Sequence, residues 1–244
     1  MKVVIFAGGF GSRLGSLTSR TPKPMIKISG KPIIWYIMKY YSHYGLNDFL
    51  ILSGYKSKVL EDFFSKNNKL FISKKKRWKI KILNTGLNTM TGGRLKRAKK
   101  YLKDEKFFCL TYGDGLSDVN ILDQIEFHKS KKKLATILAV HPPARFGLLN
   151  INKNSIVSKF EEKPINNSNL GWINGGFFVL SSKIFKFIKN DKTVWEREPL
   201  ENLAKKKQLI SFKHEKFWIA MDTIRDKKEI ETLVDKNKAP WIKW

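Results

Sequence analysis

The chain opens with Val3-Val4-Ile5-Phe6-Ala7-Gly8-Gly9-Phe10-Gly11-Ser12-Arg13-Leu14, a short apolar run that ends in a cluster of glycines. An apolar run of this length, bounded by a turn signal, predicts a buried strand over Val3–Phe6. The glycines predict a tight turn after it, because a residue without a Cβ lets the backbone bend sharply and approach a ligand closely.

The same alternation of apolar runs and helical patterns continues through the first half of the chain. Further strands are expected at Phe49–Leu52, Lys79–Leu83, Phe107–Tyr112 and Ala135–Val140, and helices at Pro32–Tyr44, Lys56–Phe64, Arg94–Leu102 and Val119–Lys131. This order predicts an α/β fold with a Rossmann-like, mixed, mostly parallel sheet and helices on both faces. The polar and basic segment Ser65–Trp78 is expected to be an exposed loop.

The strands lie closer together from about Leu148 onward. They are expected at Leu148–Ile151, Ile156–Glu161 and Trp172–Leu180 and, after two helices, at Leu209–Lys213 and Phe217–Ala220. No low-complexity linker separates this part from the first half. We therefore expect one domain over residues 1–244, with halves 1–147 and 148–244, the second being a small β-rich extension of the first.

Composition narrows the class of protein. The 244 residues suffice for one large α/β domain, and a single cysteine excludes a disulfide scaffold. Cys109 lies in an apolar run and is expected to be a buried thiol and not a nucleophile. The apolar stretch at the amino terminus is too short for a signal-peptide core or a membrane span, so a cytoplasmic protein without membrane insertion is expected.

The formal net charge of +27 leaves two hypotheses open. Clustered Lys and Arg would favour a nucleic-acid-binding protein, because such clusters neutralise phosphates. The lysine runs lie apart, however, at residues 74–77, 131–133 and 205–207. Scattered runs favour lysine-rich solvated faces with an anionic small-molecule partner, and no nucleic acid is expected.

Two cations accompany the glycine turn. Arg13 follows it directly, and Lys23 lies between Pro22 and Pro24, which restrict the backbone on both sides. Backbone N–H groups of a glycine turn suit phosphate oxygens, and the two cations could hold more of them. The spacing matches neither a dinucleotide fingerprint nor a P-loop, and a tight turn without a ligand is the alternative.

The segment Ala7-Gly8-Gly9-x-Gly11-Ser12-Arg13-Leu14, together with Pro22-Lys23-Pro24-Met25, resembles the signature of the sugar-1-phosphate nucleotidylyltransferases. Within that family, the glucose-1-phosphate cytidylyltransferase branch is the most similar, on residues 85–97, 111–115, 172–180, 221–227 and 239–241. The resemblance implies a GT-A-like fold and transfer from CTP to glucose 1-phosphate. It also implies a homo-oligomer that serves O-antigen and lipopolysaccharide biosynthesis. Use of UTP, dTTP or another sugar phosphate stays open.

The resemblance also implies roles for individual residues. The nucleotide would be bound by Phe6, Ala7, Gly8, Gly9, Gly11, Ser12, Arg13, Lys23, Thr89, Arg94 and Gly113, and the sugar phosphate by Gly147, Glu162, Lys163 and Asn174. The catalytic residues would be Arg13, Lys23 and Asp114, and the ligands of Mg²⁺ would be Asp114 and Asp222.

Simpler interpretations exist for several of these residues. Thr91 could merely cap a helix, Asp114 could be a turn aspartate, and Asp222 could cap the helix that runs to Val234. Glu162 and Lys163 could be surface ion-pair residues. The four histidines share no metal-binding spacing and are assigned no chemistry.

Overall fold

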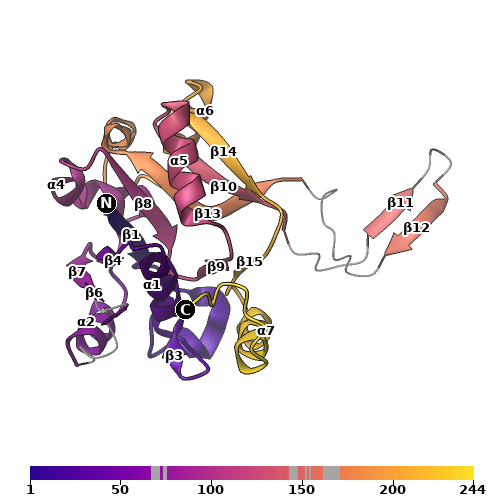
Figure 1. The fold of residues 1–244 in the computed structure, drawn as a ribbon, viewed down its shortest axis with the longest axis horizontal. Coiled ribbons are helices and arrows are strands. Elements are labelled where there is room, and N and C mark those ends of the chain that lie inside the picture. The colour runs from indigo at the N-terminus through magenta and orange to yellow at the C-terminus, as the bar shows by residue number, and fades with distance from the viewer. Residues whose placement is uncertain (67–71, 74–75, 143–147, 152, 154, 162–170) are drawn as a thin grey trace.

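The structure is a computed structural model that describes residues 1–66, 72–73, 76–142, 148–151, 153, 155–161 and 171–244 (Figure 1). Its α-helices are α1 Ile33–His43, α2 Ser57–Lys66, α3 Thr91–Arg97, α4 Lys99–Leu102, α5 Ile121–Lys131, α6 Glu198–Lys205 and α7 Ile224–Asp235. Short 3-10 helices span Ser12–Thr18, Lys23–Met25 and Ser182–Phe187. The longer strands are β1 Lys2–Ala7, β4 Asp48–Ser53, β7 Lys79–Asn84, β8 Phe107–Tyr112, β10 Ala135–Val140, β13 Ile173–Ser181 and β14 Leu209–His214. The shorter ones are β2 Lys27–Ile28, β3 Lys31–Pro32, β5 Ile72–Ser73, β6 Lys76–Arg77, β9 Gly115–Ser117, β11 Leu148–Ile151, β12 Val157–Glu161 and β15 Trp218–Ala220.

A seven-stranded sheet forms the centre of the molecule, in the order β14-β10-β13-β8-β1-β4-β7. β1 pairs in parallel with β4 and β8, whereas β13 runs antiparallel to both of its neighbours, β8 and β10. This arrangement confirms the predicted mixed, mostly parallel sheet. Because parallel strands end at the same edge, the turns after β1 and β8 lie side by side.

Helices cover both faces of this sheet, as predicted. Along β1, Val3 and Ile5 face one side, and Val4 and Phe6 face the other, as the two-residue period of a strand requires. The first side packs against α1, α2, α5 and α7, and the second against α3, α4 and α6. A strand that is buried on both faces has a continuous apolar sequence, and this is why β1 could be predicted from its sequence.

The second half of the chain is divided among three sheets. β13 and β14 join the central sheet, and β15 pairs with β9 from the first half. β11 and β12 pair with each other and stand apart from the rest of the molecule (Figure 1). All five predicted strands of this half are present, and the central sheet is shared between the two halves.

The expected helix Arg94–Leu102 differs from the observed one. It starts three residues earlier, at Thr91, and is divided into α3 and α4 at Ala98. Gly92 and Gly93 lie in its first turn because a Cβ there would come within 2.9 Å of the backbone of residues 191 and 193. The two glycines therefore serve close packing, which offsets their low helix propensity.

The interpretation of residues 65–78 as one exposed loop is wrong at both ends. Ser65 and Lys66 complete α2, and Trp78 is 5% exposed. The indole of Trp78 packs edge-on against Phe49 and donates to Ser42 Oγ at 2.8 Å. β5 and β6 pair between these ends, and residues 67–71 and 74–75 lie outside the described residues. Burial of one large aromatic side chain outweighs the basic character of its neighbours.

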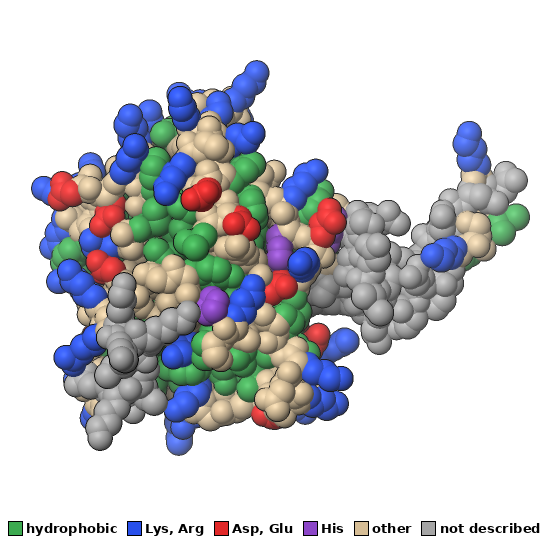
Figure 2. Space-filling view, viewed as in Figure 1, with side chains coloured by type: hydrophobic (Ala, Val, Ile, Leu, Met, Phe, Trp, Pro, Cys, Tyr) green, Lys and Arg blue, Asp and Glu red, His purple; other side chains and the backbone are tan. Residues whose placement is uncertain are grey.

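The surface agrees with the interpretation of dispersed charge. Figure 2 shows Lys and Arg side chains spread over one face with Asp and Glu between them. Cys109 is buried as predicted, and burial raises the pKa of its thiol to about 12. In the part of the chain that the structure describes, no helix combines the length and apolarity of a membrane span.

Because His128 is buried, we expect the free energy of unfolding to depend on pH. Its Nδ1 lies 2.8 Å from Thr136 Oγ1, its ring packs edge-on against Phe107, and its Nε2 has no partner among the described residues. Burial lowers the pKa of His128 to about 4. The unfolded chain therefore binds a proton more readily between pH 6.5 and 4, and stability is lost as the pH falls through that window.

We expect this one group to cost about 2 kcal/mol of the free energy of unfolding between pH 7.5 and pH 5. Urea unfolding at the two pH values measures it. In His128→Gln that part of the pH dependence should disappear, whereas His141→Gln, at a partly exposed histidine, should keep it. Equal pH dependence in wild type and His128→Gln would contradict the prediction.

Candidate active site

A cavity of about 400 Å³ lies at the edge of the sheet where β1 and β8 end. Ten of the predicted site residues line it: Phe6, Ala7, Gly8, Gly9, Gly11, Lys23, Thr89, Arg94, Gly113 and Asp114. Seven residues that were not assigned to a ligand also line it: Phe10, Pro24, Leu87, Asn88, Met90, Thr91 and Tyr112. The two strand-end turns thus form one cavity.

The glycine turn has the close packing that its sequence predicts. A Cβ on Gly8 would lie 2.2 Å from the guanidinium of Arg94, so no larger residue fits there. Gly11 has φ +65°, in the left-handed region that favours glycine, and its carbonyl accepts from Leu14 N. Ser12 begins the 3-10 helix that follows. The conformation of the turn is therefore fixed by its contact with Arg94 and by the hydrogen bond from Leu14 N.

Arg94 hydrogen-bonds to the backbone of this turn. It is 4% exposed, and its Nη1 and Nη2 donate to Ser53 O, Thr85 Oγ1, Gly86 O, Gly8 O and Leu87 O. Burial lowers the pKa of Arg94, and the nearby Arg97 adds to that effect. Arg94 thus lines the cavity, and most of its hydrogen bonds hold the backbone of the cavity wall. Its contact with a nucleotide stays a prediction.

Lys23 lies between two carboxylates from distant parts of the chain. Its Nζ is 2.6 Å from Asp114 Oδ2 and 2.7 Å from Asp222 Oδ1. Burial alone would lower the pKa of Lys23, but the two carboxylates outweigh it and raise that pKa. The sequence prediction required these three residues to share one site, and the structure brings them together.

The pairing of β9 with β15 explains why the two acids meet. Gly115 lies opposite Ala220 in this pair, and Met221 N donates to Asp114 O at 3.0 Å. Asp114, just before β9, and Asp222, just after β15, therefore lie at the same end of this strand pair. Neither acid is positioned by its local turn alone.

The alternative role of Asp222 as a helix cap is wrong. Thr223 caps α7, in a capping box with Asp226. Asp226 Oδ2 accepts from Asp222 N at 3.0 Å and from Thr223 N at 2.7 Å. The capping box fixes the backbone of Asp222, and the carboxylate of Asp222 contacts Lys23 instead.

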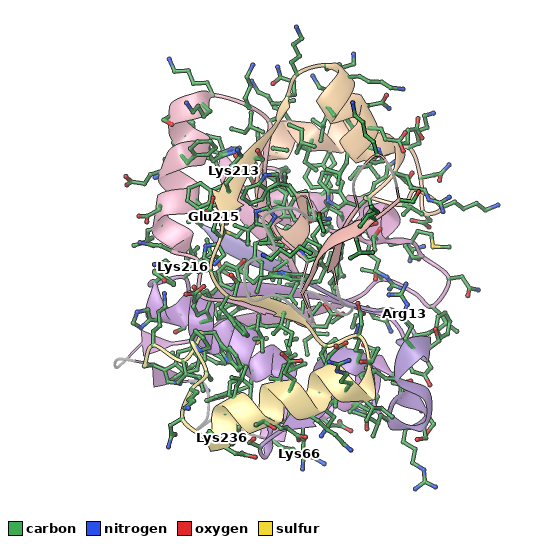
Figure 3. All side chains as sticks on the ribbon, turned by 90° about the vertical axis from the view of Figure 1, so that its right-hand side faces the viewer. Arg13, Lys66, Lys213, Glu215, Lys216 and Lys236 are labelled. Atoms are coloured by element: carbon green, nitrogen blue, oxygen red, sulfur yellow. The ribbon has the colours of Figure 1, made fainter. Side chains whose placement is uncertain are left out.

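Arg13 adds a second, more distant cation. Its side chain is 77% exposed, and its Nη1 lies 3.7 Å from Asp222 Oδ1. Figure 3 places Arg13 far from Lys213 and Lys216, so those lysines belong to another part of the surface. Arg13 lies where an exposed guanidinium could turn toward an incoming anion.

Asp114 and Asp222 form a donor set that fits a divalent cation. The ammonium of Lys23 already shows that a positive charge is stable between the two carboxylates. Mg²⁺ is commonly held by one or two carboxylates together with substrate phosphates and water. The two acids could therefore hold Mg²⁺ once a polyphosphate is present, and Lys23 would then have to release them.

On the sugar side, the structure describes one of the four predicted residues. Asn174 is exposed, and its Oδ1 accepts from Gly176 N at 2.8 Å. Gly147, Glu162 and Lys163 lie outside the described residues, so their roles stay predictions.

Sequence reasoning missed Tyr112, which lines the cavity, and Glu196, which contacts two of the lining residues. The hydroxyl of Tyr112 donates to Glu196 Oε1 at 2.5 Å, and Thr91 Oγ1 donates to Glu196 Oε2 at 2.6 Å. The helix cap suggested for Thr91 is therefore wrong, since Met90 precedes α3 and no side chain caps it. Tyr112 could have been noticed beside Gly113 and Asp114, whereas Glu196 lies in no motif.

Comparisons with known proteins agree with this geometry. The family model described as nucleotidyl transferase matches residues 2–222. The chain is 45% identical to glucose-1-phosphate cytidylyltransferase of Salmonella typhimurium and 39% identical to the probable glucose-1-phosphate cytidylyltransferase of Bacillus subtilis. Both alignments cover 100% of each chain. Among solved structures, HddC from Yersinia pseudotuberculosis superposes with a TM-score of 0.73 at 28% identity, covering 96% of this chain and 99% of that one.

Proposed function

The chain belongs to the nucleotidyl transferase family, and on that premise we propose that it converts CTP and α-D-glucose 1-phosphate to CDP-glucose and pyrophosphate. The observation that carries the proposal is the contact of Lys23 with Asp114 and Asp222 beside a cavity lined by a glycine turn. The names of the relatives that align over the full chain support the choice of substrates.

The reaction is an in-line attack by a phosphate oxygen of the hexose 1-phosphate on the α-phosphorus of the triphosphate. A new P–O bond forms there, and the bond to the pyrophosphate leaving group breaks. The second pKa of a phosphate monoester is about 6, so the nucleophile is already charged near neutral pH. The enzyme must therefore align two anions and offset their repulsion, and it needs no histidine as a base.

Different residues of the chain would align the substrates and neutralise their charge. Residues of the glycine turn line the cavity, and their backbone N–H groups would bind phosphate oxygens there. Lys23 and Arg13 would neutralise the charge that develops on the leaving pyrophosphate. Mg²⁺, when bound by Asp114 and Asp222, would neutralise phosphate charge further. Asp114 and Asp222 would hold that metal, and the ammonium of Lys23 would then contact phosphate oxygens.

The sugar phosphate would lie toward the second half of the chain. Asn174 can donate to and accept from sugar hydroxyls, and Gly147, Glu162 and Lys163 are proposed as its partners there. The proposal includes a cytoplasmic homo-oligomer that serves the synthesis of a surface polysaccharide. These last features rest on the resemblance to the family.

The test is mass spectrometry of the products from a mixed pool of nucleoside triphosphates and sugar 1-phosphates with Mg²⁺. CDP-glucose and pyrophosphate should dominate, with kcat/KM for UTP and dTTP lower by about 100-fold, because one bidentate contact with a base edge discriminates by about 1–3 kcal/mol. A higher kcat/KM for UTP or dTTP would overturn the cytidylyl assignment and keep the enzyme class.

Formation of no nucleotide sugar would overturn the class itself. Binding measurements then distinguish the transferase from the alternative, a nucleic-acid-binding protein. Protection against thermal unfolding by CTP with Mg²⁺ supports the transferase, whereas duplex binding with a steep salt dependence supports a nucleic-acid-binding protein.

A further inference from the structure

Glu196 connects two walls of the nucleotide cavity. It lies between the 3-10 helix Ser182–Phe187 and α6, outside every predicted motif. One of its carboxylate oxygens accepts from the hydroxyl of Tyr112 at 2.5 Å, and the other accepts from the hydroxyl of Thr91 at 2.6 Å. Both donors line the cavity, Tyr112 at the end of β8 and Thr91 at the start of α3. One side chain therefore joins a strand end to a helix start.

The wall on the α3 side lies next to the glycine turn. Residues 87–91 all line the cavity, and so do the glycines that follow β1. Arg94 links the two segments, since its Nη2 donates both to Gly8 O and to Leu87 O. A nucleotide that is held by the glycine turn would therefore lie against residues 87–91, and Thr91 is the last of them.

The segment that carries Glu196 is itself docked against this wall. Trp195 N donates to Thr91 Oγ1 at 2.9 Å, and Trp195 is fully buried. One step earlier in the same wall, Met90 N donates to Asp191 O at 2.9 Å. Glu196 is therefore presented by a backbone that is fixed against the wall.

The other wall is fixed by packing. The ring of Tyr112 lies against Phe6 and Phe178, at centroid distances of 5.8 and 6.2 Å. Gly176 approaches the same ring so closely that a Cβ there would lie 2.5 Å from it. The hydroxyl of Tyr112 is thus held at one place, where Glu196 accepts its proton.

The two hydrogen bonds also determine where the hydroxyl protons point. An ionised carboxylate only accepts, so Tyr112 and Thr91 both direct their single proton at Glu196. Hydrogen bonds to a charged group are the stronger ones, and here a single charge receives two of them. Removing the carboxylate would break the connection between the walls and release both hydroxyls at once.

We propose that Glu196 is a positioning residue for the nucleotide: by accepting from Tyr112 and Thr91 together, it fixes the end of β8 relative to the start of α3, and CTP binds between them. The proposal rests on the proposed function, because that function places CTP in this cavity. Glu196 is not a catalytic residue in this role, since it acts through Tyr112 and Thr91.

The test compares the full-length enzyme with its variants. Glu196→Ala should raise KM for CTP by about 10-fold, the effect of about one hydrogen bond, because CTP would then have to bring the two walls together itself. The Kd of CTP with Mg²⁺, measured without sugar phosphate, should rise by a similar factor. The value of kcat and the KM for glucose 1-phosphate should each change by less than about 3-fold.

Two further variants separate the carboxylate from the fold around it. Glu196→Gln should restore most of the loss, because its amide oxygen can accept from Tyr112 while its NH₂ group donates to Thr91. Glu198→Ala, at a surface ion pair with Lys189, is the matched control and should behave as wild type. Failure of Glu196→Gln to recover the affinity for CTP would contradict the proposal.

A double-mutant cycle tests whether both hydrogen bonds are needed. In the Tyr112→Phe or the Thr91→Val background one of the two is already absent, so Glu196→Ala should raise KM for CTP by no more than about 3-fold further. An undiminished effect in either background, or an equal loss for both substrates that follows Tm, would overturn the proposal.

Failure of the proposed function would give a different result. If the wild type uses another nucleoside triphosphate, the proposed function fails, and the variants are measured with that nucleotide. An increase in its KM in Glu196→Ala would support the role of Glu196, and an unchanged KM would overturn it.

Discussion

Replacing Lys23 with alanine should lower kcat by about 1,000-fold, the size of loss expected when one preorganised cation is removed from a phosphoryl-transfer site. Lys23 is the one cation in the described part of the chain that lies within 3 Å of both Asp114 and Asp222. Arg13 is the other cation beside these acids, but it is 77% exposed and contacts only Asp222, at 3.7 Å, so it should compensate only in part. Single-turnover formation of the nucleotide sugar measures the loss.

The fold should survive this change. Lys23 lies in a short 3-10 helix whose backbone is restrained by Pro22 and Pro24, and the carboxylates of Asp114 and Asp222 are partly exposed, so water can screen their repulsion. Lys27→Ala, at an exposed lysine four residues away, is the matched control and should keep wild-type turnover. Near-normal turnover of Lys23→Ala would remove Lys23 from the mechanism.

The same variant tests the competition between Lys23 and a metal ion. In the nucleotide-free protein, the ammonium of Lys23 lies between the two carboxylates that would bind Mg²⁺. Without it, Mn²⁺ should bind more tightly in the absence of nucleotide, as measured by electron paramagnetic resonance. Weaker or unchanged Mn²⁺ binding would show that the ammonium and the metal do not share these ligands.

The central sheet could be predicted from the sequence because burial on both faces leaves a continuous apolar run. The strands at residues 3–6 and 107–112 are such runs, and the structure confirms both. The placement of Lys23 and Asp114 at the cavity could also be predicted from their neighbours. Two prolines restrict the backbone around Lys23, and two glycines allow a tight turn around Asp114. Such local backbone signals are visible in a sequence.

Contacts between distant segments could not be predicted in this way. Arg94 hydrogen-bonds to carbonyls of residues 8, 53, 86 and 87, and nothing in the helical pattern around it shows that these carbonyls converge. Trp78 lies among basic residues that indicate a loop, but it packs into the core beside Phe49. Glu196 lies in no motif because both of its partners come from other elements. In each case, partners that determine the position of the side chain belong to other elements of the fold.

Asp114→Asn should have an effect comparable to that of Lys23→Ala and should differ from it in metal dependence. An amide keeps the size of the side chain but removes the negative charge that would hold Mg²⁺, so kcat should fall by about 1,000-fold. The Mg²⁺ concentration for half-maximal rate should rise by about 10-fold or more, because a divalent cation loses one of its two charged protein ligands. Isothermal titration of Mn²⁺ in the presence of a non-hydrolysable CTP analogue gives a second readout that does not depend on turnover.

Asp222→Asn separates a metal site from a simple ion pair with Lys23. If both carboxylates bind the metal, the two asparagine variants should lose metal affinity to a similar extent, although only Asp114 lies directly in the cavity wall. If the carboxylates served only to hold Lys23, either variant would leave Lys23 with one partner, and metal affinity would not change. Asp104→Asn, at an exposed aspartate, controls for the loss of one negative charge. Wild-type metal affinity in both Asp114→Asn and Asp222→Asn would therefore contradict the metal role while leaving the ion pair intact as a structural contact.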